Sequence, residues 1–300
     1  MRRGFIIILL LSIVLPTLAE DEDRRAHAKA LNAKVSEYYD LMPAITDAAT
    51  FYTRMNEMFR MALLCDQYDG TTAADGTIHY DYRKRNSKRL SPFLKRLIDG
   101  GSFFYERQDN KAAQMCYATY MNCISSRLFS GHWRPVDAHV AYFAALLALG
   151  SGDYLTAQRY ANIAETNADL AQDAAEIKSE CLRSTMATPV DSARYLMSVM
   201  MLHQQALGNQ AYFRQIMDYF SWPGRTAAAT QFAEAELNRD STYLLAWVML
   251  GDTRCQAGDA DGAIEAYGKA LQLSPSCTEA RRKLVQLEAN KGIQEQQETK

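Results

Sequence analysis

The segment 258–262, Gly-Asp-Ala-Asp-Gly, suggests metal chemistry, because carboxylates two positions apart are typical of calcium-binding loops. The rest of such a loop does not follow. An EF-hand loop has its glycine later than Gly262, and Ala270 stands where its closing bidentate glutamate is needed. We therefore interpret Asp259 as a helix-start residue whose carboxylate caps free backbone N–H groups, and we expect no metal site.

Catalytic motifs are absent elsewhere in the sequence. The five histidines are His27, His79, His132, His139 and His203. None belongs to a His-Glu-x-x-His motif, and neither Gly-x-Ser-x-Gly nor a Gly-x-x-x-x-Gly-Lys phosphate loop occurs. We expect no catalytic residue and no cofactor. Residues 132–135, His-Trp-Arg-Pro, stand on a predicted loop, where they form either a recognition tip or a tryptophan folded over a helix junction.

A basic run without any acid extends from residue 83 to residue 96, in a chain of formal net charge −2. Its members are Arg83, Lys84, Arg85, Lys88, Arg89, Lys95 and Arg96. The run either attracts an anionic partner or surface, or is a solvated loop followed by the start of a helix. Without residues 1–19, which hold Arg2 and Arg3, the 33 basic residues fall to 31 against 35 acidic ones. We therefore expect no binding to nucleic acid.

Residues 1–19 have the pattern of a signal peptide. Arg2 and Arg3 precede a short apolar segment that Pro16 interrupts, and Ala19 is a small residue before the expected cleavage point. No later segment is long and apolar enough to cross a bilayer. The mature chain is therefore expected to be exported, soluble, and either periplasmic or secreted, with no membrane span.

The six cysteines are spread too evenly for a disulfide scaffold. They are Cys65, Cys116, Cys123, Cys181, Cys255 and Cys277. A chain of this length with 48% apolar residues can build a core without such bonds, so most cysteines are expected to be buried as small apolar side chains. Cys116 and Cys123 lie about 10 Å apart along one predicted helix and cannot bond each other there. Other pairings stay open.

The strongest pattern in the chain is helical. Strand signals are nearly absent, and apolar residues recur at helical spacing almost everywhere after residue 25. Residues 244–277 add small, aromatic and turn residues at fixed spacing, namely Trp247, Leu250, Gly251, Gly258, Ala263, Tyr267, Ala270 and Pro275. This set resembles the tetratricopeptide repeat, a helix pair of about 34 residues. Arg254 departs from the pattern, because a tyrosine is usual there.

The small residues of this copy have a physical purpose. Ala263 and Ala270 let one helix lie close against its partner, and Tyr267 fills the volume between neighbours. Gly251 allows a close approach to the first helix, and Gly258 ends that helix. These residues are therefore expected to be structural.

The same spacing recurs along the chain. The clearest copies are 94–127, 209–242 and 244–277, and weaker ones are 36–69, 138–171 and 174–207. The resemblance implies an all-α fold, a right-handed α-solenoid of five or six tetratricopeptide-like helix pairs within residues 20–290. Polar insertions at 70–93 and 128–137 fall between copies. A helix after Cys277 is expected to cap the solenoid, and residues 291–300 are expected to be disordered.

In tetratricopeptide proteins the first helices of successive pairs line a concave groove that holds a peptide or partner segment. The register places seven candidate binding residues there, namely Ser102, Tyr105, Tyr142, Phe213, Met217, Phe220 and Asp252. The Lys and Asn residues with which some members clamp a terminal carboxylate do not occur at the matching places. The groove is instead expected to be apolar, with aromatic anchors that suit an amphipathic helix or an extended apolar segment.

One helix carries two apolar faces. Phe213, Met217 and Phe220 share one face, which the register assigns to the groove as an exposed stripe. Tyr212 and Ile216 lie on the adjacent face, which it assigns to packing. The alternative is that the groove residues themselves pack against neighbouring helices.

These observations favour a non-catalytic scaffold that binds a protein or peptide. Two other classes stay open: an enzyme or small-ligand-binding protein whose site is assembled from distant helices, and a homo-oligomer that associates through its repeats. Fold class does not decide among them.

Overall fold

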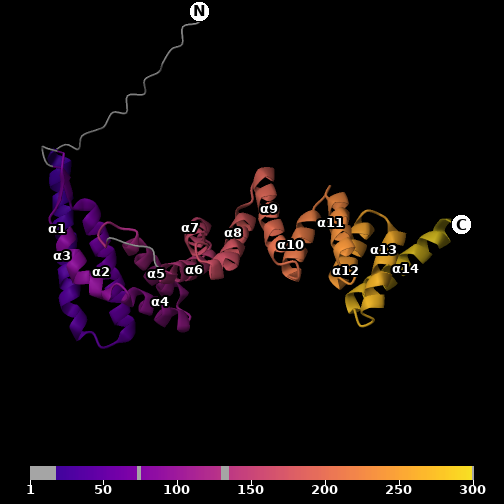
Figure 1. Cartoon of the computed structure of the whole chain (residues 1–300), viewed down its shortest axis with the longest axis horizontal. Helices are drawn as coiled ribbons and strands as arrows, with labels where there is room; N and C mark the ends of the chain where they lie inside the picture. Colours follow the sequence, from indigo (N-terminus) through magenta and orange to yellow (C-terminus); the bar gives the residue numbers. More distant parts are fainter. Residues whose placement is uncertain (1–17, 73–75, 130–134, 299–300) are drawn as a thin grey trace, which may run out of the picture. The chain divides into compact units, whose positions relative to one another are not determined.

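The computed structural model describes residues 18–72, 76–129 and 135–298 (Figure 1). The expected signal peptide therefore lies outside the described residues except for its last two positions, and so do residues 132–134 of the predicted recognition loop. The chain divides into two compact units, residues 1–181 and 182–300. Within the described ranges, no helix has both the length and the apolar character needed to span a bilayer.

Unit 1 (residues 1–181) consists of helices and one small hairpin. Its helices are α1 (Leu18–Leu41), α2 (Ala48–Tyr68), α3 (Arg83–Leu90), α4 (Arg96–Glu106), α5 (Asn110–Ile124), α6 (Pro135–Gly150) and α7 (Tyr154–Ala164). Short 3-10 turns are η1 (Met42–Ala44), η2 (Ser91–Phe93) and η3 (Ala168–Leu170). Strands β1 (Gly70–Thr72) and β2 (Ile78–Tyr80) pair antiparallel, with Thr71 opposite His79.

Unit 2 (residues 182–300) is helical throughout its described part. The boundary between the units falls within α8 (Ala171–Thr185). The following helices are α9 (Pro189–Gln205), α10 (Gln210–Phe220), α11 (Thr226–Arg239), α12 (Leu244–Gln256), α13 (Ala260–Leu273) and α14 (Thr278–Glu298). The expected all-α helical repeat is confirmed, and the helix pairs α4/α5, α6/α7 and α12/α13 lie within residues 94–127, 138–171 and 244–277, apart from the first turn of α6.

Two helix pairs pack through the same glycine–tyrosine contact. A Cβ atom on Gly251 of α12 would lie 2.5 Å from the ring of Tyr267 on α13, and one on Gly101 of α4 would lie 2.4 Å from the ring of Tyr117 on α5. Both rings are almost fully buried. Glycine is therefore required on the first helix so that the tyrosine can fill the space between the helices, as the sequence predicts.

Three turns between paired helices also share one geometry. Asp109, Asp153 and Asp259 each accept a hydrogen bond from the backbone N–H three residues later, at the start of the second helix. The residue before each aspartate has positive φ: 63° at Gln108, 78° at Gly152 and 80° at Gly258. The predicted helix-capping role of Asp259 is confirmed, and such a cap contributes about 1 kcal/mol to stability.

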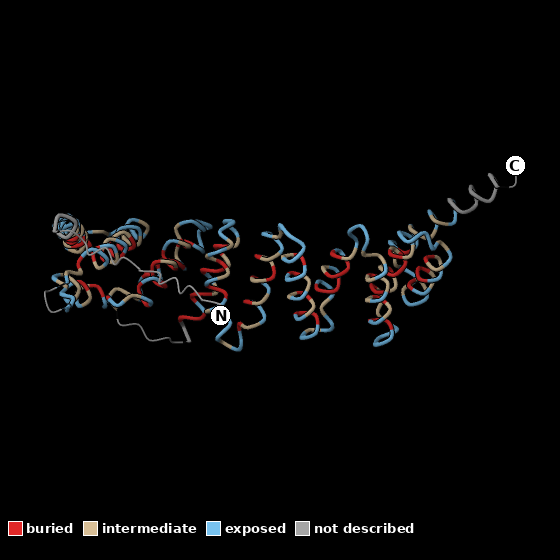
Figure 2. Tube along the Cα trace, turned by 90° about the horizontal axis from the view of Figure 1, so that it is seen from above, coloured by how far each residue is buried: buried red, intermediate tan, exposed pale blue. Residues whose placement is uncertain are grey.

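Small residues lie between the helices in both units. Ala263 and Ala270 on α13 are completely buried, as are Ala141 and Ala145 on α6 and Ala161 on α7. Figure 2 shows buried positions alternating with exposed ones along the helices of each unit, so every helix carries an inner and an outer side. The burial of the alanines that recur at the repeat spacing agrees with the structural role expected for them.

The six cysteines, all of which lie in the described ranges, form no disulfide bond, and four of them are buried. Burial raises the pKa of Cys65 and of Cys116 to about 12, so both thiols stay protonated at neutral pH. Cys255 is exposed and Cys277 is half-buried. The prediction that most cysteines serve as buried small side chains is confirmed.

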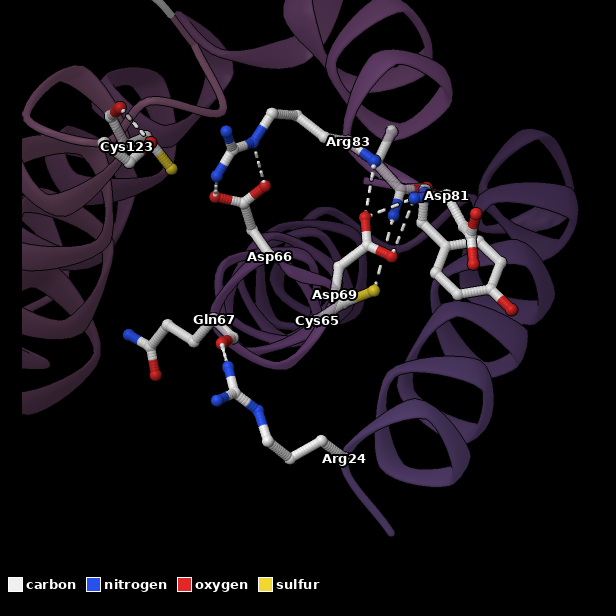
Figure 3. A network of polar contacts seen from close by, with 11 residues as sticks. Arg24, Cys65, Asp66, Gln67, Asp69, Asp81, Arg83 and Cys123 are labelled. Carbon is white, nitrogen blue, oxygen red and sulfur yellow. Dashed lines mark hydrogen bonds and ion pairs between the residues drawn. The ribbon is translucent and has the colours of Figure 1, made fainter. Parts of the chain in front are cut away.

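The insertion at 70–93 is not a simple polar loop. It forms the β1–β2 hairpin and then α3, although strand signals are nearly absent from the sequence. The carboxylate of Asp69 accepts hydrogen bonds from the backbone N–H groups of Asp81, Tyr82 and Arg83 at 2.8–3.0 Å, which joins the end of α2 to the start of α3 (Figure 3). This long-range cap orders a segment whose composition favours a loop.

The C-terminal segment also differs from its prediction. Helix α14 continues to Glu298, so residues 291–298 are helical where disorder was expected. After Gly292 the segment contains Gln, Glu and Ile but no further Gly or Pro. Gln and Glu are good helix formers, which favours continuation of the helix.

Candidate functional site

Unit 1 carries a group of partly exposed aromatic rings on the first helices of two successive pairs. We define the aromatic surface as Tyr105 on α4 with Tyr142 and Phe143 on α6. Tyr105 and Phe143 expose 41% and 36% of their area, and Tyr142 is half-buried. The ring centroids of Tyr105 and Phe143 lie 6.1 Å apart, and those of Tyr142 and Phe143 lie 5.6 Å apart. The predicted groove residues Tyr105 and Tyr142 thus lie side by side, joined by Phe143.

A buried tyrosine supports the aromatic surface from below. The ring of Tyr117 on α5 stacks with Phe143 at 6.0 Å, and its hydroxyl forms a 3.1 Å hydrogen bond with the hydroxyl of Ser102. Burial raises the pKa of Tyr117, although the bond with Ser102 acts in the opposite direction. The predicted groove residue Ser102 is exposed at the rim, where it fixes the position of Tyr117.

Carboxylates lie near the aromatic surface. The pKa of Tyr142 is raised first by burial and then by the negative charges of Asp173 and Glu176 on α8. Both acidic residues are exposed. The surface therefore combines π faces with negative charge, an arrangement that suits a cationic side chain next to an apolar one.

In unit 2, the predicted groove residue Asp252 belongs to an ion-pair network. Its carboxylate accepts a 2.6 Å hydrogen bond from the hydroxyl of Tyr267 and 2.6–2.7 Å bonds from Lys283 on α14. Lys283 also pairs with Glu279 at 3.0 Å. Burial acts to lower the pKa of Lys283, but the two carboxylates outweigh it and raise that pKa overall. Asp252 lines a cavity of about 300 Å³, where its charge is already balanced.

The prediction that Phe213, Met217 and Phe220 form an exposed stripe on α10 is wrong. Phe213 is completely buried and Met217 is 3% exposed, while Phe220 is half-buried. The ring of Phe213 lies 5.6 Å from that of Phe232 on α11 and 5.0 Å from that of Tyr243. The face that the register assigned to a groove is covered by Phe232 of the same helix pair and by Tyr243, which precedes α12.

The packing face of α10 is buried as predicted. Tyr212 and Ile216 are 3% and 0% exposed. Both apolar faces of α10 are therefore inside unit 2, which leaves no apolar stripe on this helix for a partner.

A buried histidine–glutamate pair could not be predicted from the sequence. His203 on α9 and Glu236 on α11 are 3% and 5% exposed, and their Nε2 and Oε1 atoms lie 3.1 Å apart. Glu236 also pairs with Arg239. Each member looks unremarkable by itself in the sequence, because their pairing depends on the packing of α9 against the following repeat. No group of three or more potential ligands is placed to hold a metal within the part of the chain that the structure describes.

Comparisons with known proteins reach only the level of fold. No protein-family model matches the chain, and no curated protein matches it in sequence. Among solved structures it is similar to the MamA protein, with a TM-score of 0.45, 12% identity and coverage of 61% of this chain and 92% of that one. A TPR repeats protein from Bacteroides fragilis gives a TM-score of 0.43 at 18% identity, covering 65% and 98% of the two chains. Yeast Tom70 gives 0.42 at 14% identity, covering 93% and 61%.

The chain's own packing identifies its repeat. Paired helices meet through the glycine–tyrosine contacts of Gly101 and Gly251, and their turns are capped by aspartates. The protein therefore has an all-α helical-repeat fold built from paired helices.

Proposed function

We propose that this protein is a non-catalytic scaffold that binds a segment of a partner protein, and that it acts outside the cytoplasm after removal of residues 1–19. The aromatic surface carries the proposal. Tyr105 and Phe143 keep 41% and 36% of their area in solvent, and their ring centroids lie 6.1 Å apart. Clustered exposed rings of this kind are typical of binding surfaces, since aromatic residues supply most of the binding energy at many interfaces.

The chemistry around the rings favours one class of partner segment. Asp173 and Glu176 place negative charge beside Tyr142. A lysine or arginine above the rings would gain a cation–π interaction and a nearby carboxylate at once. We therefore infer a segment with an aliphatic or aromatic anchor next to a basic residue.

The rings are held in place before any partner arrives. Tyr117 lies beneath Phe143, and its hydroxyl is fixed by Ser102. Pre-ordered rings lose less conformational entropy on binding than flexible side chains do. The aromatic surface can therefore bind a partner segment without rearranging its own rings.

The test is a selection of displayed random peptides against the full chain, followed by affinity measurements. Selected peptides are expected to carry a basic residue beside an apolar one, and Tyr105→Ser with Phe143→Ser is expected to weaken them at least tenfold. Met197→Ser is the control, because Met197 is 64% exposed on α9 of unit 2.

The melting temperature of each variant shows whether a loss of binding comes from a folding defect. Equal binding to the double variant and to the unchanged chain would reject the aromatic surface as the site. Light scattering measures the oligomeric state and so tests self-association. If the unchanged chain self-associates and the double variant is monomeric, a second copy of the chain occupies the aromatic surface, and the proposed partner segment is wrong.

A further inference from the structure

Another candidate site lies in the insertion of unit 1, and it shares no residue with the aromatic surface. Strand β2, helix α3 and the residues that follow α5 line an open cavity of about 530 Å³. We define the basic cavity by its polar lining residues, which are His79, Tyr80, Arg83, Lys84, Ser87, Lys88 and Arg127. No carboxylate lines it among the described residues.

The fold separates the basic run of the sequence into two groups. Arg89 donates a 2.8 Å hydrogen bond to the hydroxyl of Ser36 and lies over the ring of Tyr39. Arg85 lies over the ring of Tyr82. These two cations are therefore engaged with neighbouring side chains of unit 1 and do not line the basic cavity.

Arg83 forms a fixed wall of the cavity. Its guanidinium makes a bidentate pair with Asp66, at 2.6 and 2.8 Å, and stacks on the ring of Tyr80 at 3.3 Å from the centroid (Figure 3). The pairing with Asp66 raises the pKa of Arg83, so this charge is permanent and already balanced. Asp69 holds the start of the same helix.

Three other cationic side chains of the basic cavity lack a carboxylate partner like the one that Asp66 provides for Arg83. Within the described ranges, Lys84, Lys88 and Arg127 form no hydrogen bond through their side chains and no ion pair. Lys84 and Lys88 are four residues apart, so they share one face of α3. Arg127 comes from the segment after α5, which the sequence places far from α3. All three side chains are exposed, and folding brings them to the lining of one open cavity, where their positive charges act together on an anion.

We propose that the basic cavity binds the phosphate group of a small phosphate ester or of free phosphate. A phosphate dianion can accept from two ammonium groups and, bidentately, from the guanidinium of Arg127. The hydroxyl of Ser87 adds a neutral donor on the same face of α3. The volume of about 530 Å³ accommodates a phosphate with an attached group the size of a sugar. This inference does not depend on the peptide-binding proposal.

Calorimetric titration of the full chain tests the proposal at about 0.15 M salt, where long-range charge effects are screened. Inorganic phosphate, pyrophosphate, glucose 6-phosphate and citrate are the probes. The phosphate-bearing compounds are expected to bind at least tenfold more tightly than citrate, and the tighter of inorganic phosphate and glucose 6-phosphate identifies the source. Equal binding of citrate, or binding of none of the probes, would overturn the phosphate assignment.

Two double variants, each of which removes two positive charges, test whether phosphate binds in the basic cavity. Lys88→Gln with Arg127→Gln is expected to weaken phosphate binding at least tenfold. Arg85→Gln with Lys95→Gln removes the same charge outside the basic cavity and is expected to change affinity less than twofold. Equal losses in both double variants would show general electrostatic attraction and overturn the site. Circular dichroism confirms that both variants remain folded.

Discussion

Replacing Gly251 with alanine should destabilise the protein, although alanine is the better helix former. The added Cβ would lie 2.5, 2.7 and 2.8 Å from three ring atoms of Tyr267, where carbon atoms normally keep about 3.5–4 Å apart. The ring would have to withdraw by about an ångström to restore that contact. It has little freedom to do so, because it is 2% exposed and its hydroxyl is bonded to Asp252 at 2.6 Å.

The magnitude follows from two opposing effects. Overpacking of a core costs about 1–3 kcal/mol, and three atoms within 3 Å place this contact near the upper end. Replacing glycine with alanine inside a helix stabilises it by about 1 kcal/mol. The expected net loss for Gly251→Ala is therefore about 2 kcal/mol.

Urea unfolding followed by circular dichroism measures this change, and the same helix pair offers a control. Gly268 on α13 has open space where a Cβ would lie, so Gly268→Ala should stabilise the protein by about 0.5–1 kcal/mol. The two substitutions thus have opposite expected signs. A Gly251→Ala protein as stable as the unchanged chain would refute the packing argument, and Gly101→Ala repeats the test in unit 1.

Two further predictions concern unit 2. Phe213→Ala should lower the unfolding free energy by about 3–5 kcal/mol because Phe213 is fully buried, while Met201→Ala, at a 59% exposed position, should change it by less than about 0.5 kcal/mol in the same urea assay. Burial raises the pKa of Tyr243 to about 12 in the folded chain, whereas an exposed tyrosine titrates near pH 10. The stability supplied by the neutral phenol is therefore complete below about pH 10 and lost as the pH rises towards about 12. Tyr243→Phe should flatten this decline in the urea midpoint, and an unchanged decline would contradict the assignment.

The repeat could be predicted because its determinants are local. Gly251 and Tyr267 lie within one helix pair, and the aspartate of each turn caps the helix that follows it directly. Spacing within about 34 residues is enough to find such contacts. The capping role predicted for Asp259 is local in the same way, since its carboxylate accepts a hydrogen bond from the backbone of its own turn.

The rest depended on contacts that the repeat spacing does not predict. The sequence showed that α10 has two apolar faces, but only the packing of Phe232 and Tyr243 shows that Phe213 is covered. The hairpin at 70–80 likewise forms against the weak strand signal because Asp69 binds the backbone 12 to 14 residues later. Neither contact can be predicted from the spacing of residues along the chain. Both contacts determine which side chains are exposed.

The two proposed sites of unit 1 have opposite charge, which the net charge of −2 conceals. The aromatic surface lies on repeat helices next to Asp173 and Glu176. The basic cavity lies in the insertion between repeat pairs, where a solenoid can add a site without disturbing its packing. Charges at each site act mainly within a Debye length of about 8 Å at physiological salt. A cationic peptide and a phosphate therefore select different sites on one unit, so raising the salt should weaken both interactions while a charge-neutralising substitution at one site leaves the other intact.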